Sequence, residues 1–177
     1  MSQQPGWRAG ETSISFEEYA AARQAGLIRF GYLLVRDHQL AQDLAQEGLA
    51  RLHGRWSELA AESNPDAYVR KVMVNQLLSW RRRRSWSERP VAEVHDRGET
   101  DPTAAIGDRE AMWKLIGDLP LRQRAVVVLR YYEDLDDAAI GRILGCTAST
   151  VATHATRALD RLRMVVDLAD AVSPGPS

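Results

Sequence analysis

A run of small polar and basic side chains near the C-terminal end is the clearest candidate for chemistry in this chain. Hydroxyl, imidazole and guanidinium groups recur there at helical spacing, and such groups can approach base edges and phosphates together. The run contains Ser149, Thr150, Thr153, His154, Arg157 and Arg161. Because only Asp160 opposes them with a negative charge, we predict a DNA-contacting face over residues 149–161.

Two short predicted helices joined by a tight turn must position this face. Asp136 can cap the first helix, and Gly145 can supply the left-handed residue that ends it. Thr147 can cap the second helix, whose apolar residues fall on one stripe. A stop and a start this close make the helices cross, which is the helix-turn-helix arrangement that places one helix in a major groove. Two packed helices joined by a glycine can also have no DNA-binding role, so spacing alone leaves both interpretations open.

A second basic cluster ends a predicted helix that begins at Asn64-Pro65-Asp66. An Asn cap, a proline at the first helical position and an acid in the first turn are typical of a helix N-terminus. Basic and aromatic residues on this helix suit a phosphate backbone and stacking on unpaired bases. They are Arg70, Lys71, Trp80, Arg81, Arg82, Arg83 and Arg84. Trp80 could equally belong to the core, and for Tyr68 we favour the core.

Residues for catalysis or metal binding are not grouped in the sequence. The four histidines are His38, His53, His95 and His154. They lack metal-ligand spacing, and the single cysteine, Cys146, cannot complete a zinc site. Asp43 and Glu47 lie one helical turn apart, where they could pair for acid-base chemistry, but an exposed acidic face is the commoner meaning. With no phosphate-binding glycine loop and no nucleophile elbow, we expect neither an enzyme nor a cofactor.

Composition bounds the class of protein. The 177 residues are 45% apolar and carry a net charge of -1, so a nucleic-acid binder of this kind must segregate its charge. A single cysteine fits a reducing compartment, and no apolar run has the length of a signal peptide or a membrane span. We therefore predict a soluble cytoplasmic protein with no membrane insertion.

The predicted fold class is all-α, with two small helical domains over residues 13–86 and 105–170. Residues 87–104, rich in acids and helix breakers, form a predicted flexible linker, and residues 1–12 and 171–177 form predicted disordered tails. In the first domain, a capping box of Ser15 and Glu18 begins one helix. Asp37 caps another helix, which continues to Leu59 and turns its apolar residues toward the core. In the second domain, a helix over residues 112–116 precedes one that begins at Leu119-Pro120 and continues to Tyr132.

These motifs resemble, over most of the chain, the extracytoplasmic-function (ECF) group of bacterial RNA polymerase sigma factors, most closely its short SigE-like actinobacterial members. Residues 16–56 are similar to the part of sigma domain 2 that docks on core polymerase. The resemblance implies core-binding roles for Asp43, Leu44, Gln46, Glu47 and Arg51. Residues 65–84 are similar to the segment that opens the minus-10 promoter element, which adds Asn75 to the basic cluster. Residues 119–163 are similar to sigma domain 4, which reads the minus-35 element.

The resemblance implies core RNA polymerase and promoter DNA as partners, with an anti-sigma protein as a further candidate. It also implies that the loop over residues 57–65 helps to capture an unstacked base, and that the linker tethers two separately placed domains. Ala139 and Ala152 stand where the family usually has Glu and Lys, and Thr147 replaces Ser. Two alternatives are a one-component regulator with a ligand-sensing first domain, and a module that only binds other proteins.

Overall fold

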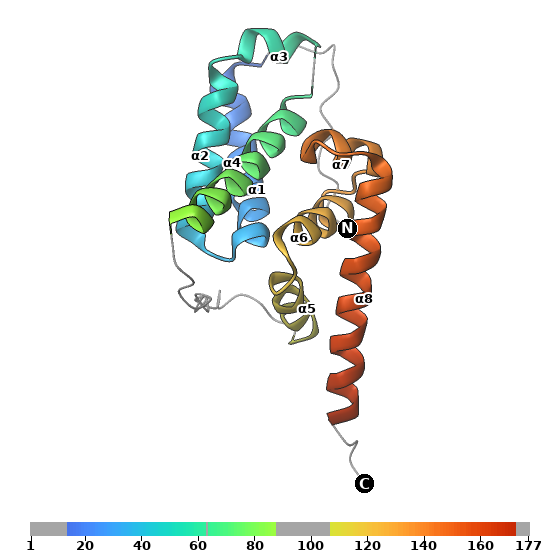
Figure 1. Cartoon of the computed structure of the whole chain (residues 1–177). Helices are drawn as coiled ribbons and strands as arrows, with labels where there is room; N and C mark the ends of the chain where they lie inside the picture. The colour runs from blue at the N-terminus through green and yellow to red at the C-terminus, as the bar shows by residue number, and fades with distance from the viewer. Residues whose placement is uncertain (1–13, 63, 88–106, 173–177) are drawn as a thin grey trace.

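The computed structural model describes residues 14–62, 64–87 and 107–172, and in those ranges every regular element is a helix (Figure 1). The N-terminal domain comprises α1 (Phe16–Val35), α2 (His38–His53), α3 (Trp56–Glu62) and α4 (Pro65–Ser87). The C-terminal domain comprises α5 (Gly107–Gly117), α6 (Leu121–Val127), the π-helical turn η1 (Val128–Tyr132), α7 (Asp137–Leu144) and α8 (Ala148–Val172). The predicted all-α class is confirmed. The predicted linker beyond Ser87 and residues 1–12 and 173–177 of the predicted tails lie outside the described residues. The predicted linker is wrong at Ser87, and the predicted C-terminal tail is wrong at residues 171–172, because these residues are helical.

The long helices of the N-terminal domain begin directly after the cap residues that the sequence predicts. Ser15 Oγ accepts from the N–H of Glu18 at 3.2 Å, and the Glu18 carboxylate accepts from the N–H of Ser15 at 2.9 Å. Asp37 accepts from Leu40 at 2.8 Å, and Asn64 accepts from the N–H of the third residue beyond it at 3.3 Å. Each cap satisfies a backbone donor that has no partner inside its helix, which sets the first residue of that helix.

The core of the N-terminal domain lies where α1, α2 and α4 pack together. Its fully buried large side chains are Phe30, Leu34, Leu44, Leu52, Val69 and Met73. They come from all three helices at helical spacing, so each helix contributes one apolar stripe. On the opposite side of α2, Asp43 and Gln46 are exposed, whereas α4 also packs against α7.

The predicted second helix is too long, because α2 ends at His53 and a separate helix, α3, begins at Trp56. Gly54 stands at the break, and glycine is among the residues least compatible with a helix interior. The N–H of Arg55 bonds to Leu52 at 2.9 Å, which tightens the last turn. Trp56 then packs against Phe16 at 5.7 Å between ring centroids. The expected base-capturing loop over residues 57–65 is therefore wrong for residues 57–62, which are helical.

The helix predicted to continue to Tyr132 changes character at Val128, where α6 passes into η1. The N–H of Glu133 reaches back to the carbonyl of Val128 at 3.1 Å, which is the wider spacing of a π-helix. Asp134 then adopts a left-handed conformation with φ 56° and turns the chain toward α7. The expected continuous α-helix is wrong here, and the wider turn sets where Glu133 points.

The predicted helix-turn-helix is confirmed in its local detail. Asp136 accepts from the N–H of Ala139 at 2.7 Å, and Gly145 takes the left-handed conformation with φ 68°. The N–H of Cys146 bonds to the carbonyl of Gly141 at 3.0 Å. Thr147 accepts from the third residue beyond it at 3.2 Å and caps α8. The turn thus stops α7 and starts α8 within a few residues.

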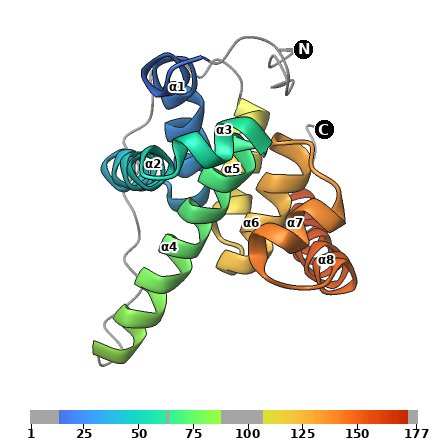
Figure 2. The same cartoon turned by 90° about the horizontal axis from the view of Figure 1, so that it is seen from above.

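The two domains touch one another. Helix α4 packs against α7, and the end of α1 packs against α5 and α6 (Figure 2). The sequence leads one to expect two separately placed bodies joined by a tether, whereas the described residues form a closed arrangement. The C-terminal end of α4 projects beyond this contact (Figure 2), and the C-terminal part of α8 extends away from the rest of the molecule (Figure 1).

Candidate nucleic-acid interface

Helix α8 separates an apolar side from a polar side. Val151, Ala155 and Ala158 are buried against the rest of the C-terminal domain. On the other side, five of the six predicted DNA-contacting residues are exposed: Ser149, Thr150, Thr153, Arg157 and Arg161. The Thr153 hydroxyl donates to the backbone carbonyl of Ser149 at 3.1 Å, so its oxygen remains an acceptor for a ligand. The structure thus brings these side chains together on one accessible face.

His154 lies at the edge of that face and is half-buried. Its Nδ1 atom is buried with no hydrogen-bond partner in the structure. Burial lowers the pKa of His154, and the positive charges of Arg122 and Arg157 lower it further. Arg122, exposed near the start of α6, therefore adds positive charge beside this face. Helical spacing does not predict Arg122 here, because its place beside this face depends on the packing of α6 against α8.

The predicted minus-10 residues of α4 fall on different sides of the helix. Five of them are exposed: Lys71, Asn75, Arg81, Arg82 and Arg83. Trp80 is half-buried and packs against the core, which favours its core interpretation. The backbone at Arg84 is helical, but its side chain lies outside the description. The structure therefore groups the accessible basic residues along one side and the projecting end of α4.

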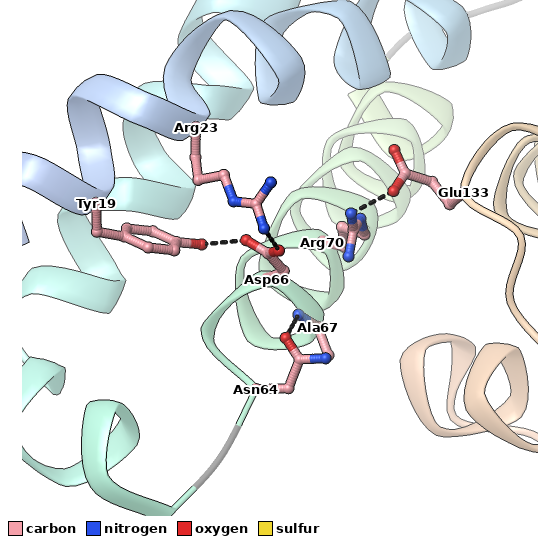
Figure 3. A network of polar contacts seen from close by, with 7 residues as sticks. All are labelled: Tyr19, Arg23, Asn64, Asp66, Ala67, Arg70 and Glu133. Atoms are coloured by element: carbon pink, nitrogen blue, oxygen red, sulfur yellow. Dashed lines mark hydrogen bonds and ion pairs between the residues drawn. The ribbon is translucent and has the colours of Figure 1, made fainter. Parts of the chain in front are cut away.

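Arg70 departs from this pattern because it is not accessible. Its guanidinium pairs with the carboxylate of Glu133 in the C-terminal domain (Figure 3), and the two side chains are only 12% and 5% exposed. Burial raises the pKa of the Glu133 carboxyl, and Arg70 offsets that effect only in part. The expectation of an available Arg70 is not met in this closed arrangement, since the pairing residue lies on the other domain.

One turn before Arg70, Asp66 holds α4 against α1. The Tyr19 hydroxyl donates to Asp66 at 2.7 Å, and Arg23 Nη2 donates to the same carboxylate at 2.6 Å (Figure 3). Burial and the neighbouring Asp66 raise the pKa of the Tyr19 hydroxyl well above its usual range. This buried network orients the first half of α4 and hence the side chains that follow it.

The residues of α2 that we expect to bind core polymerase are accessible, except for Leu44. Asp43, Gln46 and Arg51 are exposed. The Glu47 carboxylate, 41% exposed, accepts from Arg51 Nε at 2.7 Å. Leu44 is fully buried in the core. The expected contact of Leu44 with a partner is therefore wrong for this structure, because Leu44 belongs to the apolar stripe of α2 that packs in the core.

Within the described ranges, no group of three or more His, Cys, Asp or Glu residues could hold a metal ion. No helix there has the length and apolar character to cross a membrane.

Two family models match the chain, Sigma-70 region 2 over residues 20–87 and Sigma-70, region 4 over residues 109–162. The RNA polymerase sigma-E factor of Streptomyces avermitilis is 38% identical over 157 residues, which cover 89% of this chain and 88% of that protein. The corresponding factor of Streptomyces coelicolor is 39% identical over 150 residues, 85% of each chain.

A solved structure shows the same fold. It is the sigma factor RpoE in complex with the anti-sigma factor NepR from Bartonella quintana, with a TM-score of 0.67 and 20% identity, covering 86% of this chain and 96% of that one. Family models for both domains and relatives of nearly full coverage agree with the helix-turn-helix and the basic helix described above. The chain therefore belongs to the ECF sigma factors of RNA polymerase, of the sigma-E type.

Proposed function

We propose that this sigma factor reads the minus-35 element with the exposed face of α8 and engages the minus-10 element with the accessible basic side of α4. As a sigma factor, the chain binds core polymerase and directs it to promoters. The observation that carries the proposal is the α8 face, where five predicted side chains are exposed opposite a buried stripe. A recognition helix needs this arrangement, because one side must be held rigidly while the other enters the groove.

Run-off transcription with purified core polymerase is the direct test. Only a sigma factor makes the core enzyme initiate at a promoter, whereas a one-component regulator would bind an operator tightly by itself as a dimer. We expect initiation that depends on this chain. The comparisons favour a sigma factor over the one-component alternative.

Replacing Arg157 by alanine should weaken minus-35 recognition. An arginine contact to a base or phosphate contributes about 1–3 kcal/mol, so we expect promoter affinity of the holoenzyme to fall by roughly 5- to 150-fold. Arg163→Ala is the matched control, since Arg163 is exposed on a different side of α8. Binding titrations on a promoter duplex measure both variants. Unchanged affinity and promoter choice with Arg157→Ala would show that the recognition face is misplaced.

Charge reversal at Asp43 and Glu47 together should weaken binding to core polymerase. We propose that these two exposed acids, with Gln46 and Arg51, form the docking face of α2. The ion pair that the double variant breaks is an exposed one, worth at most about 1 kcal/mol, so the fold should survive. We expect at least about a tenfold loss of core affinity, a difference of 1.4 kcal/mol. Glu17→Lys, on an exposed part of α1, adds half as much positive charge away from this face and serves as the control. Equal affinities in both variants would remove this assignment.

The chain is an initiation factor, and we propose that it has no catalytic activity of its own and works beside the polymerase in the cytoplasm. We also propose an anti-sigma protein as a partner. Support comes from the Bartonella quintana factor of the same fold, which was solved with one. Co-purification of the tagged chain from its own cells, followed by inhibition of run-off transcription by the captured protein, tests this partner.

A further inference from the structure

The ion pair between Arg70 and Glu133 joins two parts of the chain whose proposed tasks are separate. Arg70 belongs to the helix proposed to engage the minus-10 element, and Glu133 ends the π-helical turn of the C-terminal domain. Both side chains are nearly inaccessible, and Arg70 Nε is buried with no hydrogen-bond partner in the structure. A guanidinium in this setting depends on its carboxylate, because removal of one partner leaves the other charge buried and unpaired.

Two further arginines cross the same boundary in opposite directions. Arg36, at the end of α1, donates from Nη1 to the backbone carbonyl of Trp113 at 2.6 Å. Arg124, on α6, donates from Nη1 to the backbone carbonyl of Leu34 at 2.5 Å. Charge-assisted hydrogen bonds of this kind are stronger than neutral ones and depend on geometry. The contact between the domains is therefore specific in its polar groups.

The same contact contains a feature that favours reopening. Burial lowers the pKa of Arg124 to about 10, and the positive charges of Arg81 and Arg36 contribute to this shift. The Arg124 guanidinium thus lies within electrostatic reach of two guanidinium groups of the N-terminal domain, those of Arg36 and Arg81. Like charges disfavour such an approach, so the closed arrangement carries an electrostatic cost that separation of the domains removes.

A carboxylate and a phosphate are equivalent partners for an arginine fork, since both offer paired oxygens that accept from the guanidinium. We propose that the unbound sigma factor is closed on itself, with the Glu133 carboxylate occupying the place on Arg70 that a DNA phosphate takes once the domains separate. This inference rests on the proposed function of α4. It adds an internal competitor for DNA, supplied by the chain's own C-terminal domain.

Glu133→Ala in the full chain tests the proposal. The radius of gyration is measured by X-ray scattering, and affinity is measured by fluorescence anisotropy with a labelled single-stranded oligonucleotide of mixed sequence. We expect the variant to expand and to bind about tenfold more tightly or better. Asp137→Ala is the matched control, because it removes one carboxylate from the same domain but breaks an ion pair with Arg130 inside that domain. The control should leave size and affinity unchanged.

Two more variants keep the result interpretable. If circular dichroism shows that Glu133→Ala has lost helix, Glu133→Gln provides the same test with a side chain of the same shape. The double variant that combines Arg70→Ala with Glu133→Ala should be expanded, but it should not bind the oligonucleotide more tightly than the parent chain. A compact Glu133→Ala or Glu133→Gln chain with unchanged affinity overturns the proposal, as does an expanded chain with no gain.

Run-off transcription separates this inference from the proposed function. In the holoenzyme the polymerase holds the domains apart, so Glu133→Ala should transcribe as the parent does while Arg70→Ala should lose promoter opening. Full activity of Arg70→Ala would contradict the proposed role of Arg70 on DNA. A different outcome would contradict only the self-closure. In it, Arg70→Ala loses run-off activity, while the free Glu133→Ala chain keeps the size and DNA affinity of the parent.

Discussion

Asp66→Ala is expected to destabilise the N-terminal domain by about 3–5 kcal/mol, the usual cost of removing one partner from a buried ion pair. Asp66 accepts from the Tyr19 hydroxyl and from Arg23 in a nearly dry environment. Without the carboxylate, the tyrosine hydroxyl loses its acceptor and Arg23 loses one of its partners. The acid also lies in the first turn of α4, where it stabilises the positive end of the helix dipole.

Urea unfolding followed by circular dichroism measures this effect. The midpoint should fall while the slope stays the same, because the surface exposed on unfolding is unchanged. Asp66→Asn should cost less than alanine, since its amide oxygen can still accept one hydrogen bond. Glu17→Ala, at an exposed site in the first turn of α1, serves as the control and should change little. A loss below about 1 kcal/mol for Asp66→Ala would show that the network does not hold α4 in place.

Gly141→Ala is expected to be harmful, although alanine normally stabilises a helix interior relative to glycine. A Cβ atom at Gly141 would lie 2.6 Å from the backbone carbonyl oxygen of Cys146, and backbone cannot move aside as a flexible side chain can. The turn must open to accept the methyl group. We expect a loss of about 1–3 kcal/mol in stability, as for other overpacked sites. Because the same turn sets the direction of α8, promoter binding at the minus-35 element should also fall at least about tenfold.

Gly26→Ala is the matched control for this prediction. Gly26 lies inside α1 with nothing within 4 Å of the added Cβ atom. The substitution should therefore stabilise the chain by up to about 1 kcal/mol through helix propensity alone. Thermal unfolding compares the two variants, and holoenzyme titrations on a promoter duplex compare their binding. Equal stability and equal promoter affinity of the two variants would mean that the turn tolerates opening.

Features set by neighbouring residues could be predicted from the sequence. Each helix cap depends on a side chain and a backbone N–H three residues further on, so Ser15, Asp37 and Asp136 were correctly placed as caps. The exposed face of α8 followed from helical spacing, which also predicted its buried stripe. The same spacing predicts acidic residues on α2 but assigns no partner, so resemblance to relatives supplied that role.

Features that depend on distant residues could not be predicted in this way. The break at Gly54 needed Trp56 to find its aromatic partners on α1, since a single glycine can also be tolerated within a helix. The widened turn before Glu133 and its pairing with Arg70 depend on how two domains meet. Hydrophobic periodicity reports which side of a helix is buried but not which charged residue of another domain lies against it.

The buried edge of the α8 face has a consequence for bacteria whose interior becomes mildly acidic. Because burial lowers the pKa of His154, the ring takes up a proton only at more acidic pH than an ordinary exposed histidine would. The charge of the α8 face therefore rests on arginines, which keep their protons throughout this range. We therefore expect DNA binding through this helix to change little when the internal pH falls modestly.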